Sequence, residues 1–139
     1  MFPIVADMAT WDDVRDITAT LPEVAENLSP DGLPGWSVRG KALAWDRPLR
    51  KGDLAALGDA APDGPILCAH VPDVGAKEAL LADGPDVYFT TPHFNGYPAV
   101  LVRLERIAPA DLAELLTEAW LARAPKRLAA EFLKTFDRG

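Results

Sequence analysis

The sequence predicts a two-layer α+β domain, with helices packed on a mainly antiparallel sheet of about five strands. Runs of β-branched and aromatic residues are grouped and joined by short turns, and they do not alternate strictly with helical patterns. A length of 139 residues fits one domain, residues 1–139, and 49% hydrophobic with 25% charged residues is typical of a globular chain. At this length folding removes about two thirds of the unfolded chain's surface from water, so one core is sufficient.

The first helix is expected to begin at Thr10, whose hydroxyl can cap the free amides while Asp13 stands three residues further on. Its inward stripe consists of Trp11, Val14, Ile17, Thr18 and Leu21. Pro22 ends the helix, and the turn-forming residues 29–35 predict a loop.

A β-hairpin is expected over residues 36–45, with Arg39-Gly40 as its turn. The pairs that this turn predicts on the core face are Val38 with Lys41 and Trp36 with Leu43. The side chains of Ala42 and Ala44 would then face away from the core. A short helical turn over residues 54–57 follows and is stopped by Gly58.

The second half of the chain begins with a strand over residues 66–71, whose two alternating sets of positions are both apolar, as in a central strand. Asp73 is expected to cap a helix that ends before Gly84-Pro85. Two short strands are predicted over residues 87–90 and 100–104.

The clearest amphipathic helix follows Pro109, which suits a first helical position. Its apolar face consists of Leu112, Leu115, Leu116, Ala119 and Trp120. Pro125 disfavours helical geometry at Ala124 and starts a last helix, whose inward residues are Leu128, Phe132 and Phe136.

The net charge of −7 repels nucleic acid on average, but the cations are concentrated in two places. Residues 39–51 contain one acidic residue and five basic ones, which are Arg39, Lys41, Arg47, Arg50 and Lys51. A second group consists of Arg123, Lys126 and Arg127. Solvated ends of amphipathic side chains are the plainer interpretation of both groups.

Targeting and redox signals favour a cytoplasmic protein. No basic residue precedes the first apolar patch, and no uncharged apolar stretch approaches the roughly 18–20 residues that cross a bilayer, so neither a secretion signal nor a membrane span is expected. Cys68 is the only cysteine, which excludes an intramolecular disulfide and a thiolate cage for zinc.

Motifs for catalysis and cofactor binding are absent. The sequence has no glycine-rich phosphate loop, no GxSxG and no HExxH, so no cofactor, metal or catalytic residue is assigned. Cys68 and His70 would share one strand face, either as a thiolate–imidazole pair or, as we favour, as a buried thiol beside a strand end. Asp12 and Asp16 form either a weak cation site or, as we favour, a solvated acidic face.

Residues 90–98, with the sequence TTPHFNGYP, form the most informative loop. Its aromatic rings and polar groups, held between two prolines, suit recognition of a ligand. The candidate pocket residues are Trp36, His93, Phe94, Asn95, Tyr97 and Arg103. The alternative is a packed turn whose Phe94 and Tyr97 cover the sheet edge.

Lys126 and Arg127 place two cations in the first turn of a helix, where each opposes the helix dipole by about 0.3–1 kcal/mol. Either they satisfy the last carbonyl groups of the preceding helix, or they attract an anion together with the free amides.

Three segments together resemble the YjbR-like family, also called MmcQ/YjbR. They are Gly40-Lys41 after an aromatic strand, TTPHFNGYPAVLVRL at positions 90–104 and APKR at positions 124–127, and the resemblance extends over about residues 10–133. It implies a compact α+β fold similar to frataxin-like and secretion-chaperone-like domains. It also implies the family's usual label, a DNA-binding protein with a proposed double-wing mode, and no family-wide catalytic residues. The segment of residues 54–65 is larger than the family's usual connection.

We therefore expect a non-catalytic binding domain with DNA as its partner. The candidate phosphate ligands are Arg39, Lys41, Arg47, Lys126 and Arg127, with Phe94 or Tyr97 available for stacking. The alternative is a domain that binds a protein or a small ligand through the loop of residues 90–98.

Overall fold

The structure, a computed structural model, describes the backbone of residues 8–137 and the side chains of residues 8–135. It is an α+β fold built on a six-stranded antiparallel sheet with the order β1-β2-β3-β4-β6-β5. The strands are β1 Val24–Leu28, β2 Pro34–Val38, β3 Lys41–Asp46, β4 Ile66–His70, β5 Tyr88–Phe89 and β6 Ala99–Arg103. The helices are α1 Trp11–Ala19, α2 Lys51–Leu57, α3 Val74–Asp83, α4 Pro109–Arg123 and α5 Lys126–Asp137, with 3-10 turns η2 Gly58–Ala60, η3 Pro92–Phe94 and η4 Leu104–Arg106.

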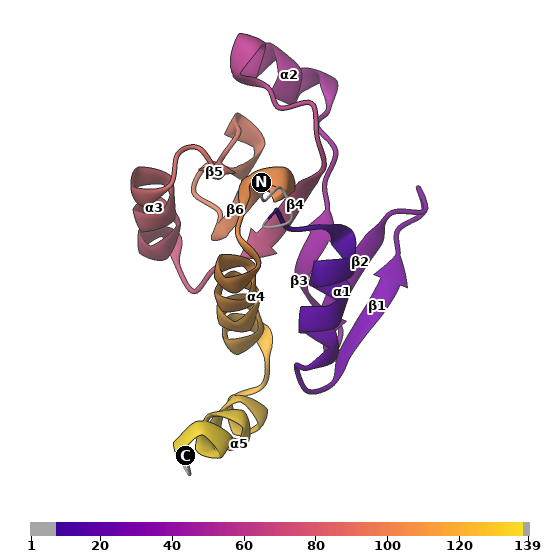
Figure 1. Cartoon of the computed structure of the whole chain (residues 1–139), viewed down its shortest axis with the longest axis vertical. Coiled ribbons are helices and arrows are strands. Elements are labelled where there is room, and N and C mark those ends of the chain that lie inside the picture. The colour runs from indigo at the N-terminus through magenta and orange to yellow at the C-terminus, as the bar shows by residue number, and fades with distance from the viewer. Residues whose placement is uncertain (1–7, 138–139) are drawn as a thin grey trace, which may run out of the picture.

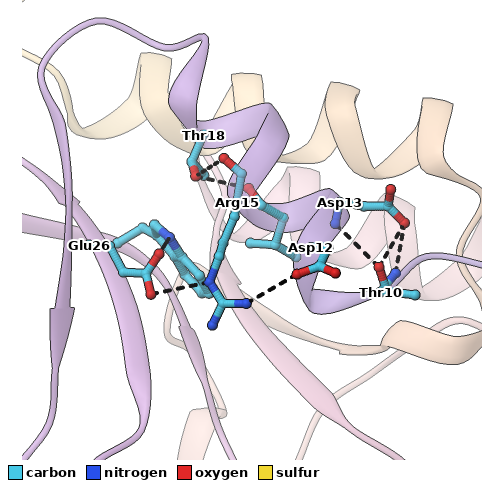
Figure 2. A network of polar contacts seen from close by, with 8 residues as sticks. Thr10, Asp12, Asp13, Arg15, Thr18 and Glu26 are labelled. Carbon is cyan, nitrogen blue, oxygen red and sulfur yellow. Dashed lines mark hydrogen bonds and ion pairs between the residues drawn. The ribbon is translucent and has the colours of Figure 1, made fainter.

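Helix α1 begins as predicted. The Thr10 hydroxyl accepts the Asp13 amide at 3.3 Å, and the Asp13 carboxylate accepts the Thr10 amide at 2.8 Å (Figure 2). Arg15 then ion-pairs with Asp12 at 3.5 Å and with Glu26 at 3.3 Å, which ties α1 to β1 (Figure 2).

Strand β1 was not predicted. It is one of the two edge strands, and apart from the half-buried Val24 its side chains are exposed, so no alternation of apolar residues marks it. Its residues pair with β2 from Val24 opposite Val38 to Leu28 opposite Pro34. The sheet therefore has six strands where about five were expected.

The β2–β3 hairpin has the predicted turn but not the predicted register. Arg39 and Gly40 both have positive φ, at 50° and 82°, and Val38 pairs with Lys41. Beyond this pair Ser37 faces Ala42 and Trp36 faces Ala44, so Leu43 is an extra residue, a β-bulge. A one-residue shift exchanges the two faces of every later position.

The bulge buries Ala44 together with Leu43 in the core, and the expectation that Ala44 faces away is wrong. It also sends the next residue, Trp45, to the opposite face of the sheet, where it packs against a second apolar cluster. This change in direction determines which tryptophan reaches the candidate site.

The remaining elements follow the prediction closely. Strand β4 is central and all five of its residues are buried. Asp73 caps α3 by accepting the Ala76 amide at 2.7 Å. Pro109 opens α4, and the five residues predicted for its apolar face are buried. On α5, Leu128 and Phe132 pack against the core, whereas the Phe136 side chain lies outside the described residues.

The two faces of the sheet are covered differently. Helices α1 and α4 lie over one face, which holds the larger core around Trp36, Leu67 and Trp120 (Figure 1). The other face carries a smaller cluster that includes Cys68 and Phe94, and the loop between β5 and β6 closes over it. Among the described residues, no helix is both long enough and apolar enough to cross a membrane.

Candidate binding site

The loop of residues 90–98, called the aromatic loop below, is anchored by Phe94. The Phe94 ring is 5% exposed and belongs to the second core cluster, while His93, Asn95 and Tyr97 are exposed. Turn η3 starts at Pro92, and the Tyr97 amide donates to the Phe94 carbonyl at 3.0 Å. The sequence predicted these four residues to lie together, and the structure brings them together.

Lys77 of α3 supports the aromatic loop from below. Its side chain is buried, and Nζ donates to the carbonyl oxygens of Phe94 at 2.5 Å and Tyr97 at 3.1 Å. Burial lowers the pKa of Lys77 below its ordinary value. No sequence pattern marked Lys77, because the carbonyl group that it binds lies about 20 residues further along the chain.

An aromatic cluster extends from the loop onto the sheet. The His70 ring lies 5.6 Å from Trp45 and 5.4 Å from Tyr97, and Tyr97 Oη is 3.3 Å from His70 Nε2. His70 is buried, and burial together with the positive charge of Arg123 lowers its pKa, so the imidazole is neutral at pH 7.

A pocket of about 450 Å³ opens beside this cluster, lined by Trp45, His93, Phe94, Asn95, Gly96 and Tyr97. Its volume lies within the range of small-ligand sites. Stacking surfaces and the carboxamide of Asn95 stand together there, which suits a flat ring with polar edges.

A buried ion pair stands behind the pocket. Arg47 and Asp53 lie 3.0 Å apart, and the Arg47 guanidinium is 5.3 Å from the centre of the Phe94 ring. Burial acts to raise the pKa of Asp53, but the Arg50 amide and the Arg47 charge outweigh it and hold that pKa below its usual value.

Arg47, expected to bind phosphate, is therefore buried and already paired with Asp53. The exposed cations at the start of α2 are Arg50 and Lys51. Arg50 lines a second pocket of about 250 Å³ with Gly52 and Pro92, and His93 lines both pockets.

Two residues predicted for the pocket lie elsewhere. Trp36 is buried on the helix-covered face, where it stacks on Trp11 at 6.2 Å. Arg103 lies at the far end of β6, with its guanidinium 4.5 Å from the centre of the Phe89 ring. Trp36 thus stays on the core face that the hairpin pattern predicts for it, and the bulge in β3 brings Trp45 to the pocket instead.

The remaining predicted cations gather at the end of the molecule where the β2–β3 turn meets α4. Arg123 Nε donates to the Ala42 carbonyl at 3.0 Å, which brings the end of α4 beside the residue that follows Lys41. We call Lys41, Arg123, Lys126 and Arg127 the cationic end. Arg39 also lies at this turn, but Glu23 pairs with it, and the hydrogen bond between them lowers the pKa of Glu23.

Lys41, Lys126 and Arg127 are exposed, and none of their side chains forms a hydrogen bond or ion pair with the part of the chain that the structure describes. The structural role considered for Lys126 and Arg127, bonding to the last carbonyl groups of α4, is thus not observed. The Trp120 carbonyl there accepts the Ala124 amide instead.

Cys68 and His70 share one face of β4, as expected, but Cys68 is fully buried. Burial raises the pKa of its thiol to about 12, and the charges of Arg47 and Lys77 only partly oppose this. Cys68 is therefore a protonated thiol. In residues 8–135, no three His, Cys, Asp or Glu side chains lie close enough together to hold a metal ion.

Comparisons with known proteins agree with this architecture. The YjbR family model matches residues 19–122. An uncharacterized protein of Mycobacterium bovis, Mb2600, and one of Mycobacterium tuberculosis, Rv2570, are each 57% identical to the chain over 129 residues, which is 91% of this chain and 97% of each relative. The crystal structure of Deinococcus radiodurans protein DR2400, a DUF419 domain, is similar in fold with a TM-score of 0.63 at 22% identity, over 85% of this chain and 80% of that one.

Proposed function

Because this chain belongs to the YjbR family, we propose that it is a non-catalytic domain that binds single-stranded DNA through the aromatic loop. The observation that carries the proposal is the position of the aromatic pocket between two sources of positive charge. On one side His93 joins it to the pocket that Arg50 lines. On the other side is His70, whose ring lies 5.4 Å from that of Tyr97 and whose pKa is lowered by burial and, to a smaller extent, by the positive charge of Arg123.

Single strands are bound by grooves that combine aromatic stacking surfaces with cations for the backbone. Here a base would stack against Trp45 or Tyr97, while phosphates on either side would meet Arg50 and Lys51 or continue toward the cationic end. The family's DNA-binding label supports the same class of partner. With a net charge of −7, DNA would bind only at the aromatic pocket and the cations beside it, because the rest of the surface repels DNA.

Fluorescence anisotropy with a labelled thymidine oligonucleotide tests the proposal. Tyr97→Ala should weaken binding by about 1–3 kcal/mol, the typical stacking contribution of one base, whereas Tyr97→Phe should retain most of it. Arg50→Gln with Lys51→Gln should reduce the slope of log K against log salt by about 1.4, as expected for two lost phosphate contacts on a single strand.

The matched control is Arg106→Gln with Lys134→Gln, which removes two exposed cations outside both pockets. If this control weakens binding as much as the α2 pair does, or if the wild-type slope is near zero, the proposal is wrong.

A small ligand in the aromatic pocket is a second candidate, and the pocket volume of about 450 Å³ favours it. A thermal-shift screen of nucleotides and other metabolites separates the two, because a bound ligand raises the melting temperature by mass action. A ligand that stabilises the wild type but not Tyr97→Ala, while oligonucleotides have no effect, supports this second candidate. We propose a cytoplasmic location for either function, in keeping with the free Cys68 thiol.

A further inference from the structure

A separate cavity of about 480 Å³ lies between α3 and α4, beside β5. Its walls are apolar and come from Ala76, Leu80, Val87, Ile107 and Leu115. The Tyr88 ring forms part of the wall and packs so closely on Gly84 that a Cβ added there would lie 3.0 Å from the ring. This cavity shares no lining residue with the two pockets beside the aromatic loop.

The rim of the cavity is acidic. The acidic residues that line it are Asp111, Glu114 and Glu118 of α4 and Asp83, which is the last residue of α3. All four side chains are exposed, and no Lys, Arg or His is among the lining residues. Within the described residues these carboxylates form no ion pair.

The spacing of the acids on α4 is unfavourable for the helix itself. Asp111 and Glu114 are three residues apart, and Glu114 and Glu118 are four apart, so like charges are neighbours along one side of α4. Their field also reaches the cavity wall: burial raises the pKa of Tyr88, and the charges of Asp111 and Glu114 raise it further. A cation in the cavity would relieve this repulsion.

We propose that this acidic pocket binds a small organic cation with an apolar body, such as a protonated arylalkylamine. The apolar group would enter between Leu80 and Leu115, the ammonium would remain at the rim near Glu114, and the Tyr88 hydroxyl offers an acceptor. The cavity has the volume of a small-ligand site, and its charge excludes phosphates and other anions. This proposal is independent of the proposed DNA-binding function.

The test uses three probes that share one aromatic body and differ in charge: phenethylamine, phenethyl alcohol and phenylacetate. Binding is followed by two-dimensional NMR through the backbone amides of Leu80, Gly84 and Leu115. The amine should bind about tenfold more tightly than the alcohol, and added salt should weaken the amine alone. Phenylacetate should cause no shifts at these amides.

Two variants assign the binding to the pocket. Glu114→Gln with Glu118→Gln should bring the amine to the affinity of the alcohol, whereas the matched control Asp16→Asn with Asp31→Asn, which changes exposed acids outside the cavity, should have no effect. Ala79→Phe should abolish binding of both amine and alcohol by filling the cavity. Equal affinity for all three probes, or an amine effect that survives the Glu114 and Glu118 changes, would overturn the proposal. So would binding of a basic helical peptide in the absence of any amine binding, which would assign the groove to a protein partner.

Discussion

The buried ammonium group of Lys77 donates a hydrogen bond of 3.1 Å to the backbone carbonyl oxygen of Tyr97. With its second bond, to Phe94, one side chain of α3 holds the tip of the aromatic loop from both ends. The conformation of the candidate site therefore depends on a residue that does not line the aromatic pocket.

We expect Lys77→Met to lower the free energy of unfolding by about 2 kcal/mol, because it leaves two loop carbonyl groups without their donor. Urea midpoints measure this loss, and Lys134→Met, a change of an exposed lysine, is the control. Since the folded pKa of Lys77 is lowered, the unfolded chain binds more protons between the two pKa values, and the contribution of Lys77 to stability rises with pH in that range. A wild-type advantage over Lys77→Met that shrinks as the pH approaches about 10 would contradict this assignment.

Asp53→Asn should destabilise the protein by about 3 kcal/mol at pH 7, because it leaves the buried Arg47 charge unpaired. The folded pKa of Asp53 is lowered, so its contribution is complete above about pH 4 and is lost as the pH falls toward the folded value. Urea midpoints between acid and neutral pH should thus converge for wild type and Asp53→Asn at the acid end. The urea midpoint of Asp31→Asn, a change on an exposed loop, should follow that of the wild type at every pH. If the midpoint of Asp53→Asn also follows the wild type, the Arg47–Asp53 pair contributes nothing to stability.

Arg123→Gln should raise the pKa of His70, because it removes a positive charge that opposes protonation. The value should remain below that of an exposed histidine, since burial is the larger cause. An NMR titration of the His70 ring measures this change. Arg127→Gln is the comparison: a shift equal to that of Arg123→Gln would mean that His70 senses only the overall charge.

Lys126→Gln with Arg127→Gln should leave the urea midpoint unchanged or slightly higher, because two unpaired cations leave the positive end of a helix. Affinity for the oligonucleotide should fall at fixed salt if the strand reaches the cationic end. Lys134→Gln, near the other end of α5, is the control. A clear decrease in the urea midpoint with unchanged affinity would instead show that this pair has a structural role where α4 meets α5.

Elements with strong local signals were predictable from the sequence. The caps at Thr10 and Asp73, the Arg39-Gly40 turn and the apolar stripe that follows Pro109 each depend on residues a few positions apart. Strand β1 depends instead on pairing with β2, and its exposed residues carry no apolar alternation of their own.

The candidate site was predicted where it is local and missed where it depends on packing. His93, Phe94, Asn95 and Tyr97 are within one loop, so the sequence places them together. The bulge at Leu43 has no sequence marker, and a regular hairpin would have kept Trp45 on the face of Trp36. Asp53 follows Arg47 by six residues, but only the turn into α2 shows that they pair and are buried.

Trp120 Nε1 donates to the Pro22 carbonyl across 98 residues of chain, and α4 supplies the cover for α1 and for strands β3 and β4. During synthesis, the N-terminal hairpin leaves the ribosome well before Pro109 and the helix that it opens. Until then only α1 can cover the apolar surface around Trp36 and Leu43, and such incompletely covered surfaces are where nascent chains associate or recruit chaperones. Productive folding of this chain is therefore completed only after most of it has been translated, and truncation within α4 should yield insoluble protein.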